Sequence, residues 1–142
     1  MKVFRLEHRE NRRGVYQADS DIYWRMSEEA GMRHDDRHPV AHDDSMLKHS
    51  FKARNLNLDM GVTLNGGFRF GFVSITQMRA WFYKDKGYAV MKDFGIVLRV
   101  YEIPEEDVFV GNTQTVFRTC HMESAPFETV ELDTLVNNNF VI

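Results

Sequence analysis

The chain has 142 residues, 43% of them hydrophobic and 13% aromatic, which is enough apolar surface for the core of one domain over residues 1–142. A formal net charge of −3 and a pI near 6.1 exclude a general attraction to nucleic acid or to an anionic membrane. A single cysteine, Cys120, excludes an intramolecular disulfide and a cysteine-based zinc cluster.

The N-terminal residues lack the apolar run of a signal peptide, and no segment approaches the roughly 18 continuous apolar residues of a membrane helix. The lone cysteine fits a reducing compartment. We therefore expect a cytoplasmic protein that has no membrane partner.

The first elements are a strand and a short helix. Residues 2–8 alternate between two faces, with Phe4 and Leu6 on one face and Arg5 on the other, which predicts a strand. The segment Asp19-Ser20-Asp21 can start a helix that buries Met26 and ends at Gly31.

Residues 32–65 form a long polar segment that we expect to be rich in loops. Within it, short helical turns are expected around Met46-Leu47 and Phe51, followed by extended chain after Leu56. A loop of this length in a small domain usually serves a function or moves.

The densest polar cluster lies at 34–44, where three histidines and four aspartates fall close together. Imidazole and carboxylate groups are ligands for zinc, manganese or iron. Pro39, however, prevents a helix with His34, His38 and His42 on one face. We interpret the segment as a solvated loop without a metal, and a metal-dependent enzyme stays open as an alternative.

The clearest local signal is a strand that runs directly into a helix at residues 66–82. Phe68, Phe70 and Phe72 alternate with small or polar residues, which predicts one aromatic face of a strand. Ser74 fits the N-cap of the following helix, with Gln77 placed to complete a capping box. Gly87 is the expected end of this helix.

The second half of the chain predicts further strands. The nearly continuous apolar run 94–103 is typical of a strand covered on both faces. Residues 107–110 and 114–119 flank the turn dipeptide Gly111-Asn112, which indicates a hairpin. A last extended piece covers 127–132. We predict an α+β fold with a mostly antiparallel, strongly bent sheet and two to three helices.

Other catalytic patterns are weak in this sequence. Ser74 already has a structural role as a cap, and Cys120 lies in a strand-like region where a buried thiol is usually inert. No glycine-rich phosphate loop is present. Five aromatic residues could stack on bases, but core or interface packing is the favoured interpretation: Tyr16, Tyr23, Trp24, Trp81 and Tyr83.

Several short motifs spread over most of the chain resemble a group of small uncharacterised proteins common in bacteriophage genomes. They are Phe4-Arg5-Leu6-Glu7-His8, Gly14-Val15-Tyr16, His38-Pro39 with Asp43, Gly71-Phe72-Val73-Ser74 with Gln77 and Trp81-Phe82, Val100-Tyr101-Glu102-Ile103, and Gln114-Thr115-Val116-Phe117. The resemblance implies a phage origin and a role inside an infected bacterial cell.

A second resemblance is to the ADP-ribosyltransferase fold, in which an arginine, a Ser-x-Ser/Thr segment and a late glutamate hold NAD. Arg5, Ser74-Ile75-Thr76 and Gln114 occur here in that order. The resemblance implies NAD as cofactor, bound by Arg5, Ser74 and Thr76, with His8 and Tyr16 flanking the site. Gln114 takes the catalytic position, but its amide cannot supply the negative charge of the glutamate.

Two functions follow as hypotheses. The first is a phage accessory protein that binds NAD or a related nucleotide, with transferase activity left undecided. The second is a non-enzymatic protein that uses residues 32–65 to bind a host factor, for instance in anti-defence. Arg5, Ser74 and Gln114 each also have a purely structural interpretation. The aliphatic part of Arg5 would cover an edge strand, Ser74 would cap a helix, and Gln114 would be an exposed strand residue.

Overall fold

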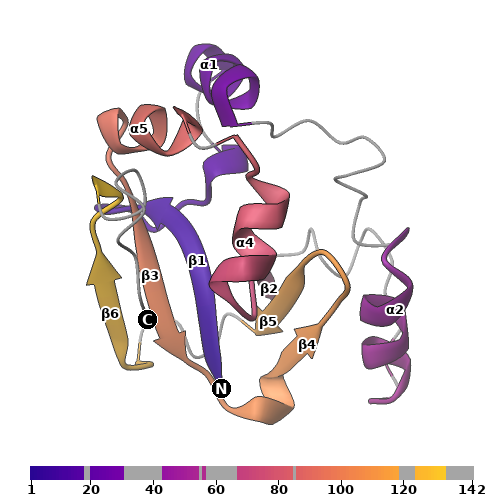
Figure 1. Cartoon of the computed structure of the whole chain (residues 1–142). Coiled ribbons are helices and arrows are strands. Elements are labelled where there is room, and N and C mark those ends of the chain that lie inside the picture. The colour runs from indigo at the N-terminus through magenta and orange to yellow at the C-terminus, as the bar shows by residue number, and fades with distance from the viewer. Residues whose placement is uncertain are drawn as a thin grey trace.

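A computed structural model describes residues 1–17, 20–30, 43–54, 56, 67–84, 86–118 and 124–133 (Figure 1). In chain order its elements are β1 (Lys2–His8), η1 (Val15–Gln17), α1 (Ser20–Ala30), α2 (Ser45–Lys52), β2 (Phe68–Gly71), α4 (Ile75–Trp81), α5 (Lys86–Asp93), β3 (Ile96–Glu102), η3 (Glu105–Asp107), β4 (Val108–Val110), β5 (Thr115–Arg118) and β6 (Phe127–Val130). The predicted α+β class is confirmed, with six strands in this described part of the chain. The prediction of two to three helices is wrong, because the described residues hold four α-helices, and α5 was not predicted as a separate helix.

The strands form two antiparallel three-stranded sheets, ordered β1-β3-β6 and β2-β5-β4. A backbone bridge joins them just after β2 ends. The amide of Phe4 donates to the carbonyl of Phe72 at 2.8 Å, and the amide of Phe72 donates to the carbonyl of Phe4 at 2.7 Å. The predicted antiparallel pairing is thus confirmed, whereas the strong bend of the sheet stays a prediction.

Gly71 makes this bridge sterically possible. A Cβ atom at this position would lie 2.8 Å from Cγ1 of Val3 and 2.9 Å from the carbonyl oxygen of Phe4. Both distances are shorter than a normal carbon contact, so β1 can approach β2 this closely only beside a glycine.

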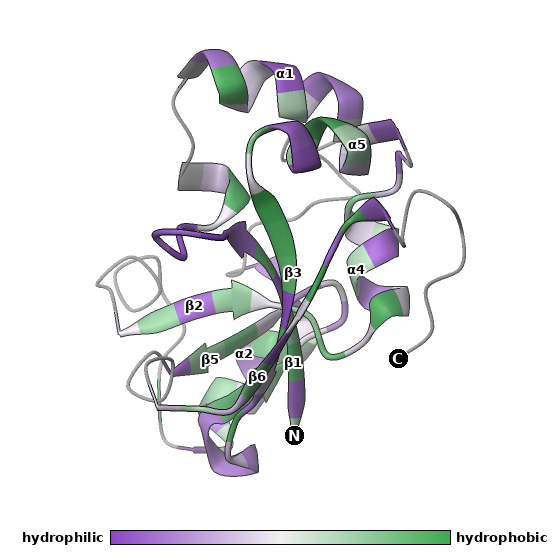
Figure 2. Ribbon diagram, turned by 90° about the vertical axis from the view of Figure 1, so that its left-hand side faces the viewer, coloured by the Kyte–Doolittle hydropathy of each residue, from purple (hydrophilic) through white to green (hydrophobic). Residues whose placement is uncertain are grey.

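The hydrophobic core lies in three clusters. The largest packs α1, α4 and α5 against β1 and β3, and β3 is hydrophobic along most of its length (Figure 2). A second cluster packs α2 against the sheet of β2, β4 and β5, with Phe51 stacked on Phe109 at a centroid distance of 4.2 Å. A third, smaller cluster joins Tyr101 and Phe117 across the two sheets.

The two faces of β1 have different surroundings. Successive strand residues point to opposite faces. Phe4 and Leu6 belong to the cluster that packs against α1, α4 and α5. Val3, Arg5 and Glu7 therefore point to the opposite face.

The predicted cap of α4 is confirmed. Ser74 is the N-cap, and its hydroxyl accepts a hydrogen bond from the amide of Gln77 at 3.0 Å. The reciprocal bond differs from the predicted capping box, because the Gln77 side chain accepts from the amide of Val73 at 2.9 Å. The side chain therefore fastens the residue before the cap, where the chain leaves β2.

The prediction that this helix ends at Gly87 is wrong. α4 ends at Trp81, with Phe82 as its C-cap, and Gly87 is a buried residue of a second helix, α5. The actual left-handed glycine is Gly95, at φ +80°, where α5 gives way to β3.

The predicted aromatic face of β2 is only partly buried. Phe68 packs in the cluster under α2, and Phe72 packs in the cluster under α4. Phe70, between them, is 40% exposed. The chain thus passes from the cluster under α2 to the cluster under α4, and the ring of Phe70 packs in neither of them.

The other predicted elements agree with the structure. The strands at 2–8 and 96–102, the hairpin at 108–118 and the helices at 20–30 and 45–52 all lie where the sequence predicts them. The extended chain expected after Leu56 and the segment 32–42 fall outside the described residues.

Replacing Gly71 with alanine is expected to lower the free energy of unfolding by about 1–3 kcal/mol, because the new methyl group must displace Val3 or the backbone of β1. Urea titration followed by circular dichroism measures the change. Gly67→Ala is the matched control, since no atom lies within 4 Å of its added Cβ. Equal stability of the two variants would contradict this account.

Candidate functional site

A surface depression of about 640 Å³ lies beside α4, next to the turn between β4 and β5. The residues that line it come from these two segments: Val73, Ser74, Thr76, Gln77, Ala80, Trp81, Tyr83, Asn112 and Thr113. Its walls are thus fixed by a helix on one side and a hairpin turn on the other.

Gln77 ties the two walls together. Its amide nitrogen donates to the carbonyl of Gly111 at 2.9 Å. Its amide oxygen accepts from the hydroxyl of Thr115 at 2.9 Å, in addition to the amide of Val73. One side chain therefore sets the separation between α4 and the hairpin.

Asp44 holds the turn from the other side. One oxygen of its carboxylate accepts from the amides of Leu47 and Asn112, at 3.1 and 2.9 Å. The other accepts from the amide and hydroxyl of Thr113, both at 3.0 Å. The same carboxylate thus caps α2 and fixes the turn that forms one wall of the depression.

The surroundings of Asp44 lower the pKa of its carboxyl group. Burial raises this pKa, but the hydrogen bonds from Asn112, Thr113 and Leu47 outweigh burial, so the net shift is below the ordinary value of 3.8. The segment 34–44 was predicted as a solvated loop. Asp44, its last residue, is instead buried, and both of its carboxylate oxygens accept hydrogen bonds.

Aromatic side chains form the floor and one edge of the depression. Trp81 is 5% exposed, and its indole nitrogen donates to the hydroxyl of Tyr16 at 2.8 Å. Tyr83 is 40% exposed. The remaining lining is small apolar, hydroxyl and amide groups, and none of the lining residues in the described chain carries a charge.

The structure brings some of the predicted NAD residues to this depression. Ser74 and Thr76 line it, and Tyr16 contacts its Trp81 wall. Gln114 is buried beside it, with its amide nitrogen 3.5 Å from the hydroxyl of the lining residue Thr113. These four predicted residues therefore gather around one feature.

Arg5 and His8 lie elsewhere. Arg5 is 5% exposed on the face of β1 that points away from α4. Its Nε donates to Glu7 at 3.2 Å, and its Nη1 donates to the carbonyl of Phe70 at 2.6 Å. His8 ends β1, and a Cβ at Gly95 would lie 3.6 Å from its ring. The predicted convergence of Arg5 with Ser74 is not what the structure shows.

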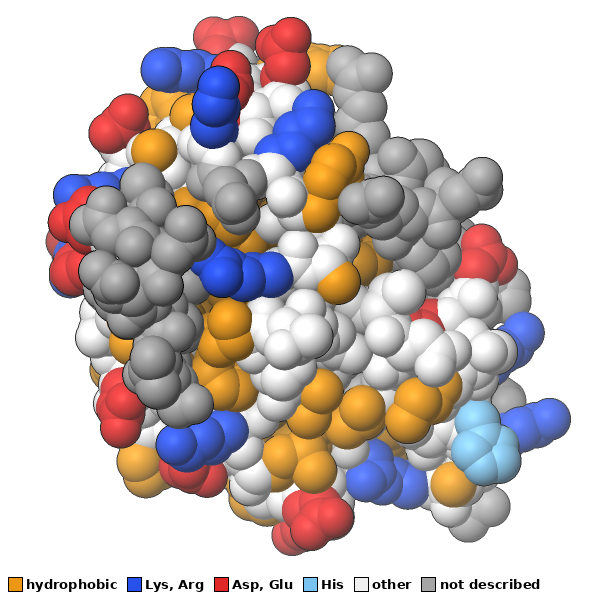
Figure 3. Space-filling view, viewed as in Figure 1, with side chains coloured by type: hydrophobic (Ala, Val, Ile, Leu, Met, Phe, Trp, Pro, Cys, Tyr) orange, Lys and Arg blue, Asp and Glu red, His pale blue; other side chains and the backbone are white. Residues whose placement is uncertain are grey.

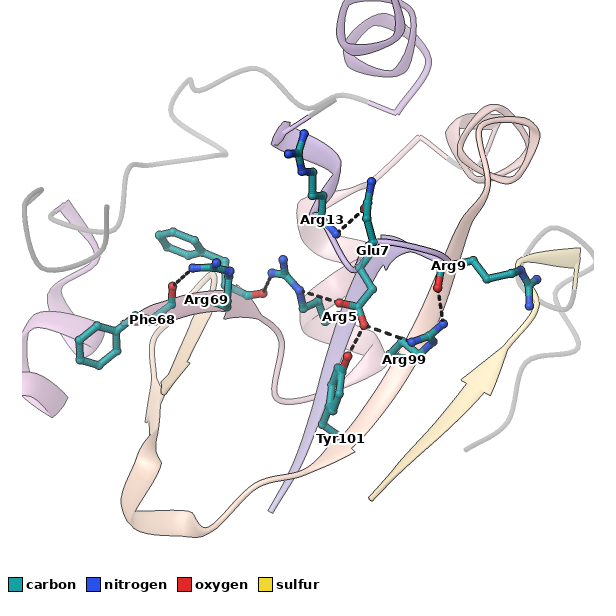
Figure 4. Close-up of polar contacts among 10 residues, drawn as sticks. Arg5, Glu7, Arg9, Arg13, Phe68, Arg69, Arg99 and Tyr101 are labelled. Carbon is teal, nitrogen blue, oxygen red and sulfur yellow. Dashed lines mark hydrogen bonds and ion pairs between the residues drawn. The ribbon is translucent and has the colours of Figure 1, made fainter. Parts of the chain in front are cut away.

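Arg5 belongs to a buried ionic network that Figure 4 shows on this face. Glu7 is completely buried and lies between Arg5 and Arg99, whose Nη1 is 3.8 Å away. Tyr101 donates a hydrogen bond to the same carboxylate. Two guanidinium groups and one phenol therefore share one carboxylate inside the protein.

Burial and pairing shift the pKa values in this network. Burial lowers the pKa of Arg5, although the Glu7 carboxylate acts in the opposite direction. Burial also raises the pKa of Tyr101, and the hydrogen bond to Glu7 adds to the increase. The phenol thus keeps its proton and remains a donor to Glu7 at physiological pH.

The network residues Glu7, Arg99 and Tyr101 were not predicted as a group. The signal that could have predicted the network was the alternation of the first strand. Arg5 and Glu7 fall on the same face of this strand, and the residues between and before them are apolar. Arg99, inside an apolar run, needed a buried partner for the same reason.

The other candidates for chemistry do not form a site in the described chain. No group of three or more His, Cys, Asp or Glu side chains in that part is placed to hold a metal. His34, His38, His42 and Cys120 lie outside the described residues. None of the described helices has the length and apolar character needed to cross a lipid bilayer.

Comparisons with known proteins support the phage resemblance. Residues 1–131 match the family model described as "Bacteriophage T4 Y00F protein". A relative is an uncharacterised 19.7 kDa protein of the motB-dexA intergenic region of Enterobacteria phage T4, 26% identical over 109 residues. The match covers 66% of this chain and 62% of that relative. No solved structure matches the chain, so the ADP-ribosyltransferase likeness stays a prediction.

Asp44→Asn is expected to lower the free energy of unfolding at pH 7 by about 1–3 kcal/mol, because the amide cannot accept all four hydrogen bonds. Since the folded-state pKa lies below 3.8, the advantage of the wild type is complete well above that pH and is lost as the pH falls below it. Urea denaturation from pH 7 to pH 2.5 measures both effects. Asp43→Asn, at the exposed neighbouring position, should cost little.

Arg5→Ala is expected to destabilise the fold by about 3 kcal/mol, because it removes a buried partner of Glu7. Thermal and urea unfolding measure the loss. Arg9→Ala, which breaks an exposed ion pair with Glu131, should cost at most about 1 kcal/mol. A fully stable Arg5→Ala protein would show that the arginine does not hold the sheet face together.

Proposed function

The chain belongs to the family of the bacteriophage T4 Y00F protein, and we propose that it is a phage accessory protein that acts by binding a bacterial protein. The observation that supports this proposal is a group of aromatic side chains on η1, on α1 and just after α4, of which three are exposed. We call it the aromatic surface, and it consists of the exposed Tyr16, Trp24 and Tyr83 with the partly buried Tyr23.

The rings of the aromatic surface are linked in space. Tyr16 and Tyr23 have ring centroids 6.2 Å apart, and Tyr23 and Trp24 have centroids 6.0 Å apart in an edge-on arrangement. Tyr16 also accepts the hydrogen bond of Trp81, which lines the depression beside α4 together with Tyr83. The aromatic surface and the depression therefore share Tyr83 and meet at Trp81.

Three of the four side chains of the aromatic surface are exposed. Trp24 is 57% exposed, Tyr83 is 40% exposed and Tyr16 is 37% exposed. Figure 3 shows hydrophobic side chains at the surface on the face that α4 covers, among charged groups. Tryptophan and tyrosine dominate the binding energy of protein interfaces, because they bury a large area with few rotatable bonds.

This location differs from the predicted interaction segment at residues 32–65. Of that segment the structure describes α2 and its immediate neighbours, residues 43–54 and 56. The described part serves the fold, through Asp44 and Phe51. The aromatic surface is the stronger candidate in the described chain because three of its side chains are exposed, whereas Asp44 and Phe51 are buried.

A second candidate function is the binding of NAD or a related nucleotide. The observation that favours it is that Ser74 and Thr76 line the depression with Trp81 and Tyr83, and Gln114 lies directly behind Thr113. Arg5 does not support this candidate as a phosphate ligand, because it is engaged with Glu7 and Phe70. An ADP-ribosyltransferase-like activity rests on resemblance alone.

Trp24→Ala is expected to weaken binding to a bacterial partner at least 30-fold, the effect of losing a central aromatic contact. A photo-crosslinking amino acid at position 24, used in infected-cell lysate, first identifies the partner by mass spectrometry. Calorimetry with the purified partner then compares the wild type with Trp24→Ala.

Phe70→Ala is the matched control, since this ring is also 40% exposed but lies on β2 outside the aromatic surface. It should bind normally, and a crosslinker at position 70 should capture nothing specific. An equal loss in both variants, or no partner crosslinked at position 24, would contradict the proposal.

A further inference from the structure

We propose that the depression beside α4 binds an uncharged planar heterocycle of the nucleobase type, with any phosphate groups of the ligand lying outside it. This inference rests on the second candidate function, nucleotide binding, and assigns the part of the ligand that the protein recognises. It is argued from the lining of the depression.

The size and apolar lining suit a small aromatic ligand. A volume of about 640 Å³ lies within the range of small-molecule sites, which are mostly apolar with a few polar groups. Tyr83 supplies an aromatic ring that is 40% exposed, and the buried Trp81 supports the lining from the core. Val73 and Ala80 supply apolar walls. Stacking on aromatic side chains is the usual way in which proteins hold an unpaired base.

The polar groups of the lining match the edge of a base. Asn112 offers a side-chain amide, whose nitrogen also donates to the hydroxyl of Ser45 at 3.3 Å and whose oxygen and second N–H match the donor and acceptor pattern of a purine edge. Thr76 adds a hydroxyl group on the helix side. The hydroxyl of Ser74 instead accepts from Gln77, and that of Thr113 donates to Asp44. Hydroxyl and amide groups recognise a neutral heterocycle without requiring it to be ionised.

The same lining disfavours a phosphate. No lining residue in the described chain is basic, so the lining offers a phosphate none of the charged contacts that arginine or lysine supplies. Arg5, which the resemblance assigned to NAD binding, points to the other face of β1 and pairs with Glu7. The lack of basic side chains in the lining therefore favours the uncharged base as the bound part of the ligand, and the phosphate groups would lie near solvent.

The depression is held in shape before any ligand arrives. Gln77 links α4 to Gly111 and Thr115, and Asp44 fixes the backbone of Asn112 and Thr113. A site with both walls fixed loses little conformational freedom when it binds. Such preorganisation favours a rigid, flat ligand.

Isothermal titration with adenosine, free nicotinamide, NAD and inorganic pyrophosphate tests the inference. We expect adenosine, which carries an uncharged base, to bind with a Kd within about threefold of that of NAD, and pyrophosphate neither to bind nor to compete. NMR should place the largest shifts on the ring of Tyr83 and on the side-chain amide of Asn112.

Variants at position 83 separate this inference from nucleotide binding in general. Tyr83→Ala should weaken nucleoside binding at least tenfold and Tyr83→Phe should restore it, because the ring is the contact. Phe70→Ala, at an equally exposed ring that is not part of the lining, should bind normally. Circular dichroism confirms that each variant is folded.

The outcomes distinguish the nucleobase site from nucleotide binding in general. If NAD binds but Tyr83→Ala has no effect, or if pyrophosphate competes, the nucleobase site is overturned while nucleotide binding stands. If neither nucleosides nor NAD bind at millimolar concentration, both the inference and the nucleotide-binding candidate fail.

Discussion

The structure depends on one close approach of two backbones, where β1 passes beside the end of β2. The pair of hydrogen bonds between Phe4 and Phe72 joins the two sheets, and Gly71 leaves the space for it. Two residues after Phe72, Ser74 caps α4. The position of the helix, and of the depression that it lines, therefore follows from the contact between the sheets.

Local patterns predicted most elements of this fold because each element carries its own signal. The alternation in β1, the Ser74 cap and the Gly111-Asn112 turn all act over a few residues. The helix boundary at Gly87 failed because a glycine is compatible with both a helix end and a buried helical position. Only the packing of α5 against α1 and β3 decides between them.

The candidate site was less predictable, because it is assembled across long separations. Ser74 and Thr76 were chosen by their order in the chain, and they line the depression. Arg5 was chosen on the same basis but points away, since strand pairing decides which face of β1 meets α4. Gln77 and Asp44 fix the site through contacts with residues 34 to 69 positions away, which no local pattern reveals.

The pairing of the first strand has a consequence for how the protein folds as it is made. β1 pairs with β3 from Lys2 with Glu102 to His8 with Ile96, and the amino group of Met1 donates to the carbonyl of Ile103. β1 must therefore wait for its partner until residues 96–102 have been synthesised, and the sheet is complete only when β6 has followed. Contacts so distant in sequence make folding slow.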